Sequence, residues 1–115
     1  MITEAKNLFE TEAYKSANNR AYYAIEKCVK ALLAIKETDA TTHSGVLKQF
    51  NYHYIFQGDG TFTAEDYKMI AGAERIRSAS DYDEFYVASK AETVEQVKNA
   101  EHLFQRIKEY ILNQT

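Results

Sequence analysis

Apolar positions recur at helical spacing from Ala13 to Lys36, and this is the clearest periodic signal in the chain. At 100° per residue, one set of apolar side chains falls within a stripe roughly 80° wide, as on a helix that faces a core. A second apolar patch lies farther round the same helix. The pattern predicts a helix buried on more than one side, as in the centre of a bundle or against a second subunit. The stripe is formed by Tyr14, Ala17, Ala21, Ile25, Cys28, Leu32 and Ile35, and the patch by Tyr22, Val29 and Leu33.

Shorter helices are predicted before and after this one. The first covers residues 2–10 and is separated from the long helix by a break in the next two residues. After a polar loop, His43 or Ser44 begins a helix that runs to about Tyr54. Thr42 or Ser44 is the candidate N-cap, because a hydroxyl there can accept a hydrogen bond from a free backbone N–H.

Two more helices complete the chain. The glycines of QGDGT mark a turn, and Thr63 then opens a helix over residues 63–78 with acidic side chains in its first turn. Residues 79–88 lack a helical period and are interpreted as an ordered connection. Ser89, with Glu92 three residues later, predicts the start of the last helix. Its apolar stripe is Ala91, Val94, Val97, Ala100, Phe104, Ile107 and Ile111.

Together these elements predict an all-α fold, an up-and-down antiparallel four-helix bundle with a short additional helix. At 115 residues the chain should form a single domain, residues 1–115. The absence of proline fits a nearly all-helical chain.

Composition narrows the function classes. A net charge of −3 argues against a protein that coats duplex DNA. The chain has no long apolar run and no leader at its start, and its single cysteine cannot form an internal disulfide, so we expect a cytoplasmic protein without a membrane segment. Nine tyrosines favour a subunit interface or a substrate groove.

Arg20 is the most unusual residue of the long helix, because a charged side chain in a largely buried segment needs a partner or a function. Lys27 follows seven residues later on nearly the same side, with Ala24 and Ala31 between and beyond the two cations. This shoulder could contact RNA or another anion. The alternative is an arginine paired with a carboxylate and a solvated lysine.

The segment ERIRSASDYDEF contains a second candidate group, with Arg77 and Asp81 in it. Asp81 and Asp83 could be metal ligands, but no further ligand follows at a familiar spacing, so their pairing with arginines and backbone amides is favoured. The three histidines, His43, His53 and His102, form no zinc motif and are given structural roles. We therefore expect neither a metal nor a cofactor.

Three runs in order, NNRAYYAIEKCVKALLAIK, TTHSGVLKQF and ERIRSASDYDEF, followed by an apolar-striped last helix, support a comparison with a known family. The chain resembles the HEPN superfamily over almost its whole length, from about Ala13 to Ile111. More narrowly, it resembles the small prokaryotic HEPN proteins often found beside a minimal nucleotidyltransferase.

The resemblance implies a helical homodimer whose cleft holds an R-x(4–6)-H motif in the active members. There the arginine and histidine carry out metal-independent RNA cleavage. Arg20 matches the arginine, but Lys27 stands where relatives with a similar RAYYA run carry the histidine. A solvated lysine stays protonated and is a poor general base, so the ribonuclease mechanism is expected to be broken.

Two hypotheses follow. In the first, the chain is a non-catalytic HEPN module that forms a homodimer and binds a partner protein, possibly a nucleotidyltransferase, or a nucleotide. In the second, it is a toxin-like ribonuclease that uses Arg20 with a substitute such as Lys27 or Glu26. The predicted RNA or nucleotide contacts are Arg20, Tyr23, Lys27, Arg77 and Asp81, and the predicted dimer interface is Arg20, Tyr23, Ala24, Lys27 and Ala31.

Overall fold

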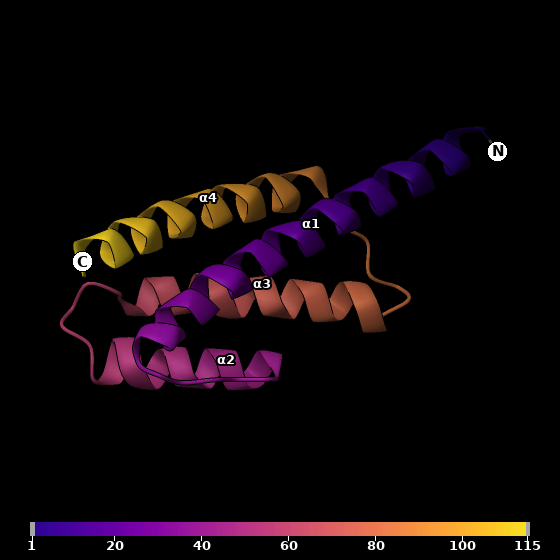
Figure 1. The fold of residues 1–115 in the computed structure, drawn as a ribbon. Coiled ribbons are helices and arrows are strands. Elements are labelled where there is room, and N and C mark those ends of the chain that lie inside the picture. Colours follow the sequence, from indigo (N-terminus) through magenta and orange to yellow (C-terminus); the bar gives the residue numbers. More distant parts are fainter. Residues whose placement is uncertain (1, 115) are drawn as a thin grey trace.

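The computed structural model describes the backbone of residues 2–114 and the side chains of residue 6 and residues 10–114. Over this range the chain forms helices and no strand, which confirms the predicted all-α bundle (Figure 1). The elements in order are α1 (Ile2–Ile35), α2 (His43–Phe50), the π-helical segment η1 (Asn51–Phe56), α3 (Ala64–Tyr82) and α4 (Lys90–Asn113).

The first helix is one unbroken rod of 34 residues, so the predicted break after residue 10 is wrong and there is no separate short helix. Neither Thr11 nor Glu12 is a glycine or proline, and Glu12 pairs with Lys15 at 3.7 Å along the helix surface. At 1.5 Å per residue α1 is about 51 Å long, and its first turns extend past the other helices (Figure 1).

Helix ends follow the predicted capping residues. Thr42 accepts a hydrogen bond from the backbone of Gly45 at 2.9 Å and so begins α2. The Thr63 backbone donates to Asp66 at 2.9 Å at the start of α3. Ser89 accepts from the Glu92 backbone at 3.1 Å at the start of α4.

Two boundaries differ from the prediction. The second helix continues through η1 to Phe56 instead of ending at Tyr54. The third continues to Tyr82 instead of ending at residue 78. An ion pair between Arg77 and Asp81, four residues apart at 2.6 Å, spans its last turn, and such a pair stabilises a helix.

The core is built around α1, as its two apolar sets predicted. Ile25, Val29, Leu32 and Leu33 are all almost fully buried, and each contributes about 1.5–3 kcal/mol relative to an exposed position. They pack in one cluster with residues from every other element, including Phe50, Tyr54, Phe62, Ile70, Ala73, Leu103 and Ile107.

The last helix presents a different face to the core than its apolar stripe predicted. Val94, Val97 and Phe104 are exposed, whereas Thr93 and Gln96 are buried together with Leu103 and Ile107. The contact with α1 therefore follows only one edge of the stripe. An apolar surface remains uncovered along α4 within the single chain.

Candidate functional site

A polar hollow of about 450 Å3 lies between α1 and the end of α3 and contains Arg20. The first helix contributes most of the lining because its residues project from successive turns toward α3. Two lining residues, Ser80 and Asp81, come from the end of α3. The α1 residues are Glu12, Lys15, Ser16, Asn19, Arg20 and Tyr23.

Arg20 itself is exposed and forms no ion pair with any side chain that the structure describes. Among the described residues, neither Asp81 nor Asp83 pairs with it. Asp81 binds Arg77 instead, and Asp83 accepts a hydrogen bond from the Phe85 backbone at 2.9 Å. The guanidinium of Arg20 thus keeps its five donors available for a ligand.

Arg77 has the opposite environment. It is 5% exposed, and it binds Glu74 at 3.0 Å and Asp81 at 2.6 Å while lying over the ring of Tyr22. Hydrogen bonding to Glu74 raises the pKa of the guanidinium and outweighs the opposing effect of burial. Arg77 therefore holds α3 against α1 and fixes Asp81 at the hollow. Its contact with RNA or a nucleotide stays a prediction.

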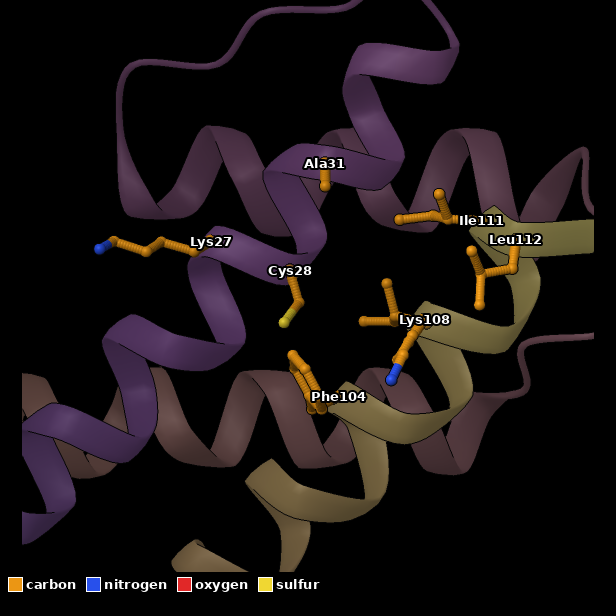
Figure 2. Close-up of a pocket in the computed structure, with 8 residues that line it drawn as sticks. Lys27, Cys28, Ala31, Phe104, Lys108, Ile111 and Leu112 are labelled. Carbon is orange, nitrogen blue, oxygen red and sulfur yellow. The ribbon is translucent and has the colours of Figure 1, made fainter. Parts of the chain in front are cut away.

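Lys27 lies in a separate place. With Cys28 and Ala31 it lines an apolar hollow of about 310 Å3 between α1 and α4 (Figure 2). The thiol of Cys28 points into this hollow toward Phe104, and burial raises the pKa of that thiol. The lysine side chain extends away from it. Arg20 and Lys27 therefore line different hollows and do not form one site.

The other predicted interface residue, Ala24, lines a second apolar hollow of about 470 Å3 that shares Phe104 with the first. Ala24, Lys27 and Ala31 are all exposed along this edge of α1. We call the two hollows together the α1/α4 groove. It coincides with three of the five residues predicted to meet a second subunit.

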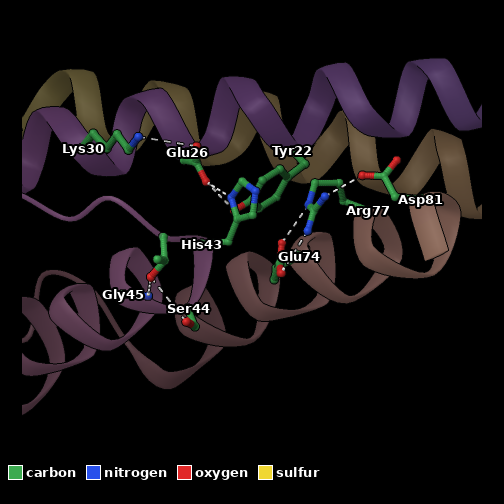
Figure 3. A network of polar contacts seen from close by, with 10 residues as sticks. Tyr22, Glu26, Lys30, His43, Ser44, Gly45, Glu74, Arg77 and Asp81 are labelled. Atoms are coloured by element: carbon green, nitrogen blue, oxygen red, sulfur yellow. Dashed lines mark hydrogen bonds and ion pairs between the residues drawn. The ribbon is translucent and has the colours of Figure 1, made fainter.

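A third group of polar residues joins α1, α2 and α3 on another side of α1 (Figure 3). Glu26, only 9% exposed, accepts a hydrogen bond from the Tyr22 hydroxyl at 2.6 Å. His43, at the start of α2, contacts the same carboxylate oxygen and lies 2.9 Å from the Tyr22 hydroxyl through Nδ1. Lys30 lies 3.7 Å from the other oxygen of Glu26.

These contacts decide the protonation of the group. Burial would raise the pKa of Glu26, but hydrogen bonds from Tyr22 and His43, and the charges of His43 and Lys30, outweigh burial and lower it. Burial and the bond to Glu26 raise the pKa of Tyr22. Glu26 therefore stays an ionised acceptor and Tyr22 stays a protonated donor.

Sequence reasoning gave Glu26 a minor role and His43 a purely structural one. A signal was present for Glu26, since it lies on the same face as Tyr22, Val29 and Leu33, and a carboxylate inside an apolar patch needs donors. No comparable signal identified His43, because its partner is 17 residues away on another helix. Among the described side chains, no three His, Cys, Asp or Glu gather as metal ligands do.

The described helices also include none that has both the length and the apolar character needed to cross a membrane. The fold and the Arg20 hollow define an all-α bundle that carries its polar site on one long central helix. A family model of the HEPN domain matches residues 1–110, and the chain belongs to the HEPN domain family.

Three similar proteins support this assignment. A protein of Methanocaldococcus jannaschii named "putative toxin" is 34% identical over 97% of this chain and 75% of its own length. A second protein of that organism with the same kind of name is 37% identical over 70% of this chain and 59% of its own length. A UPF0332 protein of Thermotoga maritima is 31% identical over 96% of this chain and 82% of its own length.

Proposed function

We propose that this chain acts as a homodimeric HEPN module that binds RNA or a nucleotide through a phosphate group at Arg20. The observation that carries the proposal is an exposed arginine without an ion-pair partner among the described residues, at the wall of a polar hollow. A guanidinium presents its donors in a planar fork that fits two phosphate oxygens.

The neighbours of Arg20 suit such a ligand. Tyr23 lines the same hollow and is 44% exposed, and an accessible aromatic face can stack on an unpaired base. Lys15 adds a second cation, although Glu12 at 3.7 Å partly offsets its charge. Asp81 is neutralised by Arg77, so its carboxylate repels a phosphate less than a free one would.

The α1/α4 groove supports the dimer. Its walls are apolar, and Phe104 is 53% exposed between its two hollows. In a twofold dimer the same patch occurs on both copies, so the Phe104 ring of each copy can fill a hollow of the other. The small side chains Ala24 and Ala31 let a second helix approach closely.

The surroundings of Lys27 favour binding of RNA over cleavage of RNA by Arg20 and Lys27 together. An exposed ammonium group can attract a phosphate, but it lacks the burial that makes a lysine a proton acceptor. Its place in the α1/α4 groove also separates it from the Arg20 hollow.

A protein partner is the second candidate, favoured by relatives whose names describe toxins. A toxin is held inactive by an antitoxin-like partner, and a nucleotidyltransferase encoded nearby would fit that role. Copurification from the native cell tests this candidate, and absence of any stoichiometric partner would count against it.

Fluorescence anisotropy with a labelled single-stranded RNA tests the phosphate site. Arg20→Ala should weaken binding about tenfold or more, as expected for loss of a charge-assisted contact. Arg75→Ala is the matched control, since Arg75 is an exposed arginine that lines a different hollow on α3. Equal losses in the two variants would show that the protein attracts RNA through its general charge and not at Arg20.

A further inference from the structure

Two lysines, Lys27 and Lys108, line the apolar hollow that contains Cys28, and neither forms an ion pair among the described residues. We propose that this Cys28 hollow binds a medium-chain alkyl carboxylate, with the chain against the apolar wall and the carboxylate toward Lys108. Such binding does not depend on the Arg20 site and goes beyond the function proposed above.

The wall of the Cys28 hollow supplies an apolar surface for an alkyl chain. Its volume of about 310 Å3 lies at the lower end of the range for small-molecule pockets. Phe104, Ile107 and Ile111 line it at spacings of three and four residues, so they project from one face of α4. A linear chain that lies along this face contacts all three side chains and leaves water, which stabilises its binding.

The charged residues that line the Cys28 hollow are all positive. They are Lys27 on α1 and Lys108 on α4, and no Asp or Glu is among the lining residues. Figure 2 shows Lys108 on the α4 side of the hollow, across from Lys27 on α1. A lysine stem can cover apolar surface while its ammonium group donates to an anion. An anionic head is therefore attracted to the edge of this hollow, and an amine is repelled from it.

The neighbouring hollow at Ala24 has the opposite charge. Among its lining residues Glu101 is the charged one, and Phe104 lines both hollows. A carboxylate is repelled by Glu101 and attracted by Lys108. This difference orients the ligand in the α1/α4 groove, with its head at the Cys28 hollow.

The depth of the site favours a single free chain over a lipid surface. Ile107 is 2% exposed and Cys28 is half-buried, so both lie below the protruding side chains of the groove. A flat bilayer contacts protruding residues, whereas one alkyl chain can enter between the helices. A second copy that fills the groove would compete with the ligand for the same volume.

Cys28 gives a direct measure of occupancy. It is the single cysteine of the chain, and its thiol points into the hollow toward Phe104 (Figure 2). An alkyl chain in the hollow covers this thiol. A maleimide should therefore react with Cys28 about tenfold more slowly when decanoate is present at ten times its dissociation constant. In urea-unfolded protein, decanoate should leave the reaction rate unchanged.

Isothermal titration calorimetry of the full chain with decanoate, below its micellar concentration, tests the binding itself. Octanoate should bind about tenfold more weakly, because two fewer CH2 groups leave water. Decylamine and decanol carry the same chain with a cationic or a neutral head. Each should bind about tenfold more weakly than decanoate, or worse, because the charge-assisted contact with the lysines is lost.

Variants of the lining residues place the ligand in the hollow. Lys27→Glu combined with Lys108→Glu should weaken decanoate binding about tenfold or more and remove the preference over decylamine. Lys98→Glu is the matched control, since Lys98 is exposed on α4 and does not line the hollow. Ala31→Phe introduces a ring into the hollow from an exposed position and should abolish both binding and the protection of Cys28. Circular dichroism checks that each variant is folded.

Several results would overturn the inference and leave the proposed RNA site and dimer standing. They are no saturable binding of decanoate, equal binding of decanoate and decylamine, or an Ala31→Phe variant that binds as wild type does. Retention on phosphatidylglycerol vesicles without binding of free decanoate would also overturn it. If the wild type dimerises through the groove, decanoate should shift it toward the monomer in light scattering. A wild type that is always monomeric would overturn the dimer, whereas lysine-dependent binding to that monomer would still support the inference.

Discussion

The two sides of α1 differ in how completely the single chain satisfies them. Toward α2 and α3, the polar side chains of Tyr22 and Glu26 meet partners from two other helices. Toward α4, Ala24 and Ala31 face apolar hollows that none of the described residues fills. The first side is already a finished interior, whereas the second has the character of a surface that a second copy would complete.

Loss of Arg77 should have the largest effect, a loss of stability on the side of α1 that faces α2 and α3. Arg77→Ala leaves Glu74 and Asp81 without their cation and is expected to lower the free energy of unfolding by about 3 kcal/mol, because Asp81 is partly exposed and the full cost of a buried pair does not apply. Urea denaturation measures this change in the free energy of unfolding. Arg75→Ala should stay within about 0.5 kcal/mol of wild type, and a similar loss in both variants would contradict the structural role given to Arg77.

A charge at Phe104 should instead weaken self-association through the α1/α4 groove. Phe104→Asp removes an exposed ring from the α1/α4 groove and is expected to weaken self-association about 100-fold, in line with about 1.5–3 kcal/mol for burying such a side chain. Light scattering across a concentration series measures the change in the dissociation constant of the dimer. Val87→Asp, an exposed apolar residue outside the groove, is the control. A wild-type protein that is monomeric at micromolar concentration would remove the dimer from the proposed function.

A smaller effect, the dependence of stability on pH, should come from Glu26 on the side of α1 that faces α2 and α3. Its pKa is lower in the folded chain than its ordinary value of 4.5, so its stabilising contribution is present above pH 4.5 and is lost as the pH falls below that value. The free energy of unfolding should therefore drop more steeply with acid in wild type than in Glu26→Gln. Parallel curves for the two proteins would show that Glu26 gains nothing from its partners.

The sequence pattern predicted the buried residues of the central helix better than those of the last one. In α1, apolar residues occupy both faces that contact other helices, so periodicity identifies buried positions such as Ile25, Val29 and Leu32, although Ile35 of the same stripe is exposed. In α4 the apolar stripe is wider than the surface that α1 covers, and periodicity cannot tell which edge faces inward. Val94 and Val97 therefore looked like core residues, whereas Thr93 and Gln96 are the buried ones.

The sequence likewise predicted only part of the candidate site. Arg20 could be identified because a charged side chain in a largely buried segment needs a partner or a function. The pair of Glu26 and His43 could not, because it depends on how α2 docks against α1, and docking geometry is not encoded in the spacing of either helix. The predicted break after residue 10 is wrong because the polar residues there include no glycine or proline, and polar residues by themselves need not end a helix.

Helix α2 has only eight residues, a length at which an isolated helix hardly forms in water. Its position must therefore come from what it is anchored to, namely Val46 and Phe50 in the core and His43 against Glu26. Hydrogen–deuterium exchange of the α2 amides should consequently report on the occupancy of the Glu26 contact, so that the integrity of the Glu26–His43 pair can be followed without any ligand.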